Sequence, residues 1–176
     1  MFNFLKKNDS YEEKLYSKIL YLSRNKFFYS ELSIDDTFQN RIYLIFLHTA
    51  FIFLKVKQNV DSDIYKKFYQ NTFDLIFKRI ELDMREIGFG DVTINKNMKF
   101  LVTNFFNILI NCEKYSSKNQ KDKNFFFNSY LKQKKHIKSD INIKLIEYFD
   151  KYHSFCLDLS TDRVLKGDLK FNYKEL

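Results

Sequence analysis

Residues 42–54, Ile-Tyr-Leu-Ile-Phe-Leu-His-Thr-Ala-Phe-Ile-Phe-Leu, are the longest apolar run in the sequence, and they decide the fold. A bilayer-spanning helix needs about 20 apolar residues, so this shorter run is typical of a helix in a protein core. Its apolar side chains occupy nearly every face of a helix expected from about Asp36 to Lys57, which places that helix in the middle of a bundle. His48 lies within the run and is therefore expected to be buried and hydrogen-bonded.

Around this central helix, apolar residues recur every three or four positions, which predicts further helices. The sequence has no proline and three glycines, whereas a domain with many tight turns would need more of both. We therefore expect an all-α fold, a single compact bundle of about six helices that forms one domain over residues 1–176. The predicted helices run from about Asp9 to Arg24, Asp36 to Lys57, Asp61 to Ile87, Thr93 to Lys114, Asn124 to Ile137, and Ser139 or Asp140 to Leu159.

The segments between these helices differ in character. Residues 25–34 are rich in aromatic side chains and are expected to form an irregular connection. Residues 116–123 are polar throughout, which is typical of a loop. Residues 160–176 include Gly167 and are expected to form a peripheral tail.

The predicted helix from Asp61 to Ile87 has the clearest amphipathic pattern. Its apolar stripe consists of Tyr69, Phe73, Phe77, Ile80, Met84 and Ile87. On the opposite face, the pairs Asp74–Lys78 and Glu81–Arg85 have the spacing at which ion pairs contribute about 0.2–0.5 kcal/mol each. Gly88 follows the helix and can adopt the left-handed conformation that ends many helices.

The sequence contains few of the patterns that indicate catalysis or cofactor binding. Gly88-Phe89-Gly90 is too short for a phosphate-binding loop, and the three histidines lack metal-ligand spacing. We therefore expect no enzyme activity, no metal or cofactor site and no small-molecule substrate. The carboxylates of Asp83, Glu86 and Asp91 are interpreted as a surface salt-bridge group beside Arg85 rather than as acid–base catalysts.

Two cysteines, Cys112 and Cys156, fall on apolar faces of predicted helices. With no further cysteine and no metal-ligand spacing, they are expected to be buried, reduced thiols, as in a reducing compartment. No export signal or membrane segment stands out, because the N-terminal residues become charged at Lys6 and Lys7. The chain is therefore expected to be cytoplasmic.

The net charge of +8 and pI near 9.3 suggest an anionic partner. Most of the excess lies between Lys114 and Lys144, where aromatic residues are interleaved with Lys118, Lys121, Lys123, Lys132, Lys134, Lys135 and Lys138. One hypothesis is that this basic stretch binds RNA or the ribosome. The alternative, that it is a solvated helix face in a lysine-rich sequence, is favoured.

Two blocks of sequence resemble the ubiquinol–cytochrome c chaperone family. The first is Leu-Asp-Met-Arg-Glu-Ile-Gly-Phe-Gly-Asp-Val at positions 82–92, followed by Lys96 and Lys99. The second contains Phe28-Tyr29-Ser30-Glu31-Leu32, then Asp36-Thr37, Arg41 and Leu47-His48. Together they place about Leu15 to Asn111 within the family. One departure is that this chain has Lys55 and Lys57 where the family tends to have arginine.

The resemblance implies a non-enzymatic assembly factor that binds newly made cytochrome b and promotes assembly of ubiquinol–cytochrome c reductase. It implies a second small assembly factor and the ribosome as further partners. Because no transit peptide stands out, the expected setting is a bacterial cytoplasm, with peripheral contact with the cytoplasmic face of the inner membrane. The residues expected to bind a partner are Asp83, Arg85, Glu86, Gly88, Gly90, Asp91, Lys96 and Lys99. Within this set, Gly90 is expected to let the backbone pass close to a neighbouring segment.

Overall fold

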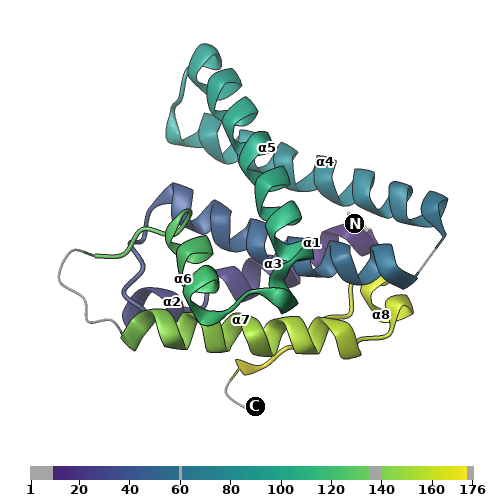
Figure 1. Ribbon diagram of the computed structural model, residues 1–176. Coiled ribbons are helices and arrows are strands. Elements are labelled where there is room, and N and C mark those ends of the chain that lie inside the picture. The colour runs from purple at the N-terminus through teal and green to yellow at the C-terminus, as the bar shows by residue number, and fades with distance from the viewer. Residues whose placement is uncertain (1–9, 60, 135–139, 174–176) are drawn as a thin grey trace, which may run out of the picture.

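The computed structural model describes residues 10–59, 61–134 and 140–173, and this part of the chain is all-α (Figure 1). Six of its helices have nine or more residues and correspond to the six predicted from the sequence. Two further helices have five residues each. In chain order the elements are α1 (Tyr11–Ser23), α2 (Lys26–Ser30), α3 (Phe38–Asn59), α4 (Ser62–Ile87), α5 (Asp91–Glu113), the 3-10 turn η1 (Tyr115–Ser117), α6 (Gln120–Asn128), α7 (Asp140–Asp158) and α8 (Thr161–Leu165).

Helix α3 occupies the centre of the bundle, as the apolar run predicted. Every residue from 42 to 54 is buried, and α1, α4, α5, α7 and α8 all contact this helix. Full burial of a leucine, isoleucine or phenylalanine side chain stabilises a fold by roughly 1.5–3 kcal/mol. The two cysteines are also buried, on α5 and α7, and the pKa of both thiols is raised by burial.

His48 is fully buried on α3 and hydrogen-bonded, which confirms the prediction. Its Nδ1 lies 2.6 Å from the carbonyl oxygen of Leu44, and its Nε2 lies 2.8 Å from the hydroxyl of Tyr148 on α7. Because a carbonyl only accepts, Nδ1 carries the hydrogen and Nε2 accepts from Tyr148. The Tyr152 hydroxyl donates to the carbonyl oxygen of His48 itself, so α7 is fixed to α3 by polar contacts as well as by packing.

Helices α4 and α5 meet at a corner that projects from the rest of the bundle (Figure 1). Helix α3 contacts both α4 and α5. The buried residues of α5 are Ile94, Leu101, Phe105, Ile108 and Cys112. On α4 the buried stripe ends at Met84, and Ile87 is 57% exposed. The prediction for Ile87 was therefore wrong, because the helix runs past the core at its last turn.

Three segment boundaries differ from those predicted. Residues 26–30 form a helix, α2, because the side chain of Asn25 caps it by accepting from the backbone N–H of Phe27. Helix α5 begins at Asp91 rather than Thr93, following extended Gly90. The segment expected to be a polar loop contains η1 and the start of α6, where Asn119 caps the helix by accepting from the N–H of Asp122.

The predicted fifth helix was also placed too far along the chain. Helix α6 ends at Asn128 rather than at Ile137, and residues 135–139 of the predicted helix lie outside the described residues. Beyond α6 the backbone extends, and Ile34 and Gln133 form an isolated antiparallel bridge.

The segment after Leu159 packs on the core, so the expectation of a peripheral tail was wrong. Val164 of α8, together with Leu169 and Phe171, is buried. Gly167 lies so close to α1 that an added Cβ would be 2.6 Å from the carbonyl oxygen of Tyr11, and its φ of +71° also favours glycine. This glycine is therefore required for the contact rather than being a sign of a loose end.

Candidate partner-binding site

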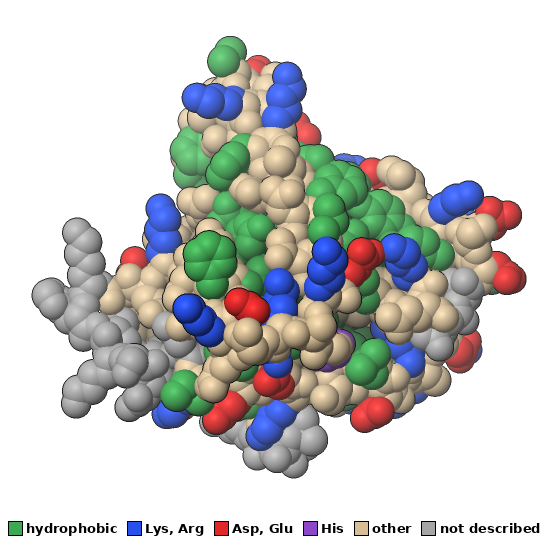
Figure 2. Space-filling model, viewed as in Figure 1, with side chains coloured by type: hydrophobic (Ala, Val, Ile, Leu, Met, Phe, Trp, Pro, Cys, Tyr) green, Lys and Arg blue, Asp and Glu red, His purple; other side chains and the backbone are tan. Residues whose placement is uncertain are grey.

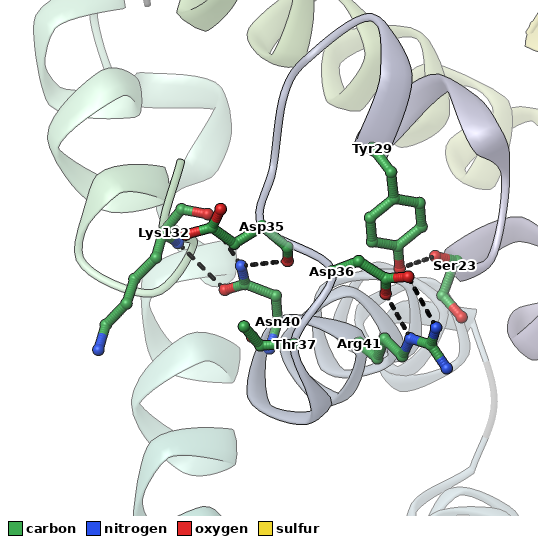
Figure 3. Close-up of polar contacts among 8 residues, drawn as sticks. All are labelled: Ser23, Tyr29, Asp35, Asp36, Thr37, Asn40, Arg41 and Lys132. Atoms are coloured by element: carbon green, nitrogen blue, oxygen red, sulfur yellow. Dashed lines mark hydrogen bonds and ion pairs between the residues drawn. The ribbon is translucent and has the colours of Figure 1, made fainter. Parts of the chain in front are cut away.

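The residues just before α3 are held by a buried amide (Figure 3). The side-chain nitrogen of Asn40 donates to the carbonyl oxygens of Asp35 and Lys132, each at 2.8 Å, and its side-chain oxygen accepts from the backbone N–H of Lys132 at 3.0 Å. Asn40 is 1% exposed and has its amide groups satisfied in this way. It joins the start of α3 to the segment that follows α6.

Two further contacts shape the outer side of this region (Figure 3). Arg41 donates through Nε and Nη2 to the two carboxylate oxygens of Asp36, at 2.6 and 2.8 Å. This bidentate pair lowers the pKa of Asp36 and raises that of Arg41. The Tyr29 hydroxyl donates to the carbonyl oxygen of Ser23 at 3.1 Å, which links α2 to the end of α1.

The α4–α5 corner has its own polar structure. Gly88 has a φ of +98°, and the backbone N–H of Phe89 donates to the carbonyl oxygen of Met84 at 3.1 Å, as expected for a glycine that ends a helix. Arg85 donates to Glu81 at 2.8 Å and to Asp91 at 2.6 Å, so one guanidinium joins the last turn of α4 to the first residue of α5. These groups are exposed, and each ion pair adds little to stability.

A mainly apolar groove of about 320 Å³ lies between the start of α3 and this corner. We call it the apolar groove. Its lining combines half-buried and exposed aromatic rings with a buried methionine and three uncharged polar side chains, and consists of Thr37, Phe38, Gln39, Ile42, Met84, Phe89, Asn97, Phe100 and Leu101. Flexible and aromatic surfaces of this kind suit apolar partners of varied shape.

A second groove, of about 280 Å³, lies on the other side of Phe38 and Ile42, which line both. Its floor is apolar, and its α4 side carries the carboxylates of Asp83 and Glu86, so we call it the acidic groove. The complete lining is Leu20, Ser23, Arg24, Phe38, Arg41, Ile42, Ile45, Ile80, Asp83, Glu86 and Ile87.

Exposed apolar side chains surround the corner. Val92 is 86% exposed, Phe100 54% and Phe89 39%. The space-filling view shows hydrophobic side chains gathered in the angle between α4 and α5, with single ones among charged side chains on the projecting corner (Figure 2). In that angle, Phe73 and Phe106 lie with their ring centroids 6.1 Å apart. Larger exposed apolar patches typically mark surfaces that bind a partner.

The structure separates the eight predicted partner-binding residues into four groups. Asp83 and Glu86 line the acidic groove, whereas Arg85 and Asp91 pair with each other on the corner. Lys96 and Lys99 are exposed on α5 and line neither groove.

The two glycines of the corner form the fourth group. Gly88 has the left-handed conformation that was predicted, but nothing lies within 4 Å of a Cβ built on Gly90, so the expected close backbone approach was wrong. Gly90 instead precedes α5 in an extended conformation.

The basic stretch is partly used within the fold. Lys123 is 16% exposed, and its Nζ lies 2.7 Å from Asp150 and 4.6 Å from the ring centroid of Tyr115. Lys118 donates to Asn111 and lies over the ring of Phe126. Lys135 and Lys138 lie outside the described residues. These contacts favour a structural role for Lys118 and Lys123.

A search of the described residues for groups of His, Cys, Asp and Glu that could hold a metal ion finds none. In the same part of the chain, no helix combines the length and apolar character needed to span a bilayer.

A family model described as "Ubiquinol-cytochrome C chaperone" matches residues 30–125, which is more than half of the chain. The chain belongs to the ubiquinol-cytochrome C chaperone family. The resemblance inferred from the two sequence blocks is thereby confirmed. The matched range contains the start of α3 and the whole α4–α5 corner.

The fold is also similar to that of a solved structure. The crystal structure of the Cbp3 homolog from Brucella abortus matches with a TM-score of 0.78, covering 94% of this chain and 90% of that chain. The two sequences are 18% identical, so this likeness shows a shared fold. No curated protein matches the chain in sequence.

Sequence reasoning missed several residues that shape the site in this member of the ubiquinol-cytochrome C chaperone family. Phe38 and Ile42 separate the grooves, and Phe100 lines the apolar one. Phe100 falls outside the apolar stripe of its helix, which is a signal that could have identified it as an exposed aromatic. The role of Asn40 depends on Lys132, which is 92 positions away and has no local signal.

Proposed function

We propose that this protein is a non-enzymatic assembly factor that binds newly made cytochrome b and promotes assembly of ubiquinol–cytochrome c reductase. The observation that carries the proposal is the pair of adjoining grooves, which are lined mostly by residues matched by the chaperone family. A chaperone for a membrane protein needs an exposed surface for apolar segments, and the apolar groove with its aromatic rim has that character. Membership in the family supports cytochrome b as the client.

The setting proposed is the cytoplasmic face of a bacterial inner membrane, where a client could be met as it leaves the ribosome. The membrane, the ribosome and a second small assembly factor are proposed as further contacts. The RNA-binding hypothesis is not carried forward, because Lys118 and Lys123 of the basic stretch make contacts within the fold.

The test uses Arg85→Ala and Asp91→Ala, which remove the ion pair that shapes the corner beside the grooves. A deletion strain is complemented with each variant, and steady-state cytochrome b is measured from its haem absorbance. We expect cytochrome b to fall although each variant accumulates normally. The reason is that the corner's side chains, rather than the stability of the bundle, are altered.

Arg163→Ala is the matched control, because it removes a similarly exposed ion pair, with Asp168, outside the matched residues. This variant should support normal cytochrome b. Normal cytochrome b in the Arg85 and Asp91 variants would mean that the corner is only a connection between helices. Photocrosslinking from Phe100 to cytochrome b would test client contact directly, and its failure in growing cells would count against the proposal.

A further inference from the structure

The acidic groove holds two carboxylates that the fold does not use. Asp83 and Glu86 make no side-chain hydrogen bond or ion pair with any other described residue. Arg85 pairs with Glu81 and Asp91, and Arg41, which also lines the groove, pairs with Asp36. The α4 side of the groove therefore carries negative charge that no cation among the described residues neutralises by direct contact.

Below these carboxylates the groove is apolar. Ile42, Ile45 and Ile80 form a buried floor, and exposed Ile87 lies at the rim. A lysine or arginine side chain has this same division, because an apolar stem leads to a charged end. Its stem can pack on the isoleucines while its cation reaches Asp83 and Glu86. Two arginines also line the groove: Arg41 of α3, which is paired with Asp36, and Arg24 at the end of α1. The side chains that attract a cation are therefore those on α4.

The adjoining apolar groove can accept an apolar side chain from the same partner. Its lining has no charged side chain, and it shares Phe38 and Ile42 with the acidic groove. Side chains one turn apart on a helix lie about 5–6 Å from each other, so neighbouring grooves can accept two side chains from one helix. One would be apolar, and the other would be basic.

We infer that the two grooves together bind the basic-flanked end of an apolar helix, with an apolar side chain in the apolar groove and a lysine or arginine against Asp83 and Glu86. This inference rests on the proposed function and names the part of the client that is recognised. Membrane proteins carry an excess of lysine and arginine in their cytoplasmic loops, close to the ends of the membrane-spanning helices. Charge complementarity thus selects the client's basic helix ends over its acidic or uncharged ones.

The first test uses two synthetic peptides with one apolar helical sequence, followed one turn later by lysine in one peptide and glutamate in the other. Binding to the full chain is measured by fluorescence anisotropy. We expect the lysine peptide to bind about fivefold more tightly, as two partly exposed ion pairs would give. High salt should reduce the difference. Equal binding of the two peptides, or binding of neither, would overturn the inference.

The second test reverses the charge of the groove. In the double variant Asp83→Lys/Glu86→Lys the preference should invert, so that the glutamate peptide binds more tightly. Glu147→Lys/Asp158→Lys changes the net charge equally on exposed positions of α7 and should keep the preference for lysine. Circular dichroism checks that both double variants remain helical. A preference that stays unchanged in the groove variant would also overturn the inference.

Crosslinking of cytochrome b in cells separates this inference from the proposed function. If cytochrome b crosslinks equally to the unaltered protein and to the Asp83→Lys/Glu86→Lys variant, the inference fails and the proposed function stands. If cytochrome b crosslinks to neither, the proposed function fails. The expected result is crosslinking to the unaltered protein and a loss of several-fold in the groove variant.

Discussion

Two sets of polar contacts of similar length differ in their exposure to water. The core cluster consists of His48, the Leu44 carbonyl and Tyr148, and the corner cluster consists of Arg85, Glu81 and Asp91. His48 is fully buried between α3 and α7, whereas Arg85, Glu81 and Asp91 are exposed to water. If a partner is removed from a buried group, the group is left unsatisfied, but water replaces a lost partner at the surface. The core cluster therefore fixes the fold, and the corner can change its chemistry with little effect on folding.

The largest effect is expected for His48→Ala, which we predict lowers the free energy of unfolding by about 3 kcal/mol. The change leaves a cavity and removes the acceptor of the Tyr148 hydroxyl and the donor to the Leu44 carbonyl. Urea denaturation followed by circular dichroism measures it. Tyr148→Phe deletes one of the two contacts and should cost less than His48→Ala. A His48→Ala variant as stable as the unaltered protein would remove the contrast between the two regions.

The core cluster should also make stability depend on pH. Burial lowers the pKa of His48 from an ordinary value of 6.5 to about 4, so between these values the unfolded chain binds a proton that the folded chain excludes. The contribution of neutral His48 to the free energy of unfolding is therefore fully present above pH 6.5. It is lost as the pH decreases towards 4, by about 3 kcal/mol in total.

Urea midpoints at several pH values between 7 and 4 would show this loss. The pKa of His153 is lowered as well, by partial burial, so the dependence is measured in a His153→Gln background. The further change His48→Gln should then remove most of the remaining dependence. The same slope with and without His48 would assign the pH response to other groups.

A smaller effect is expected in the backbone of the corner, where Gly88→Ala should destabilise the protein by about 1 kcal/mol. Gly88 has a φ of +98°, but nothing lies within 4 Å of a Cβ built there, so the cost comes from backbone strain alone. Gly90→Ala is the control, since its φ of −73° suits any residue, and its effect should be smaller. Thermal unfolding of the two variants side by side distinguishes these outcomes.

The smallest effect on stability is expected for Arg85→Ala and Asp91→Ala, each within about 0.5 kcal/mol of the unaltered protein. The pair is exposed, and water can hydrate whichever partner remains. Chemical denaturation provides the measurement. A loss above about 1 kcal/mol would show that the corner stabilises the fold, as the buried contacts of His48 do.

The sequence allowed the helices to be predicted because their apolar stripes are local. The stripe of α5 and the apolar run of α3 each required only residues within one helix. Boundaries set by a single capping side chain, such as Asn25 or Asn119, were predicted less well, because polar residues of this kind also occur in loops.

The candidate site was predictable only in part. The family-like blocks identified the corner, yet they did not distinguish Asp83 and Glu86, which line a groove, from Lys96 and Lys99, which do not. That distinction depends on how α4 packs against α3. The burial of the segment containing Leu169 and Phe171 likewise depends on contacts with distant helices.

The hydrogen bond between His48 and Tyr148 joins positions that are 100 residues apart, and this separation has a consequence for synthesis. A ribosome adds about 5–20 residues each second, so the apolar surface of α3 waits roughly 5–20 s for α7 to be made. During that interval the face of α3 that α7 will bury stays uncovered, although α1, α4 and α5 have already been made. While it is being made, the protein therefore has exposed apolar surface of its own, as does the newly made membrane protein that it is proposed to bind.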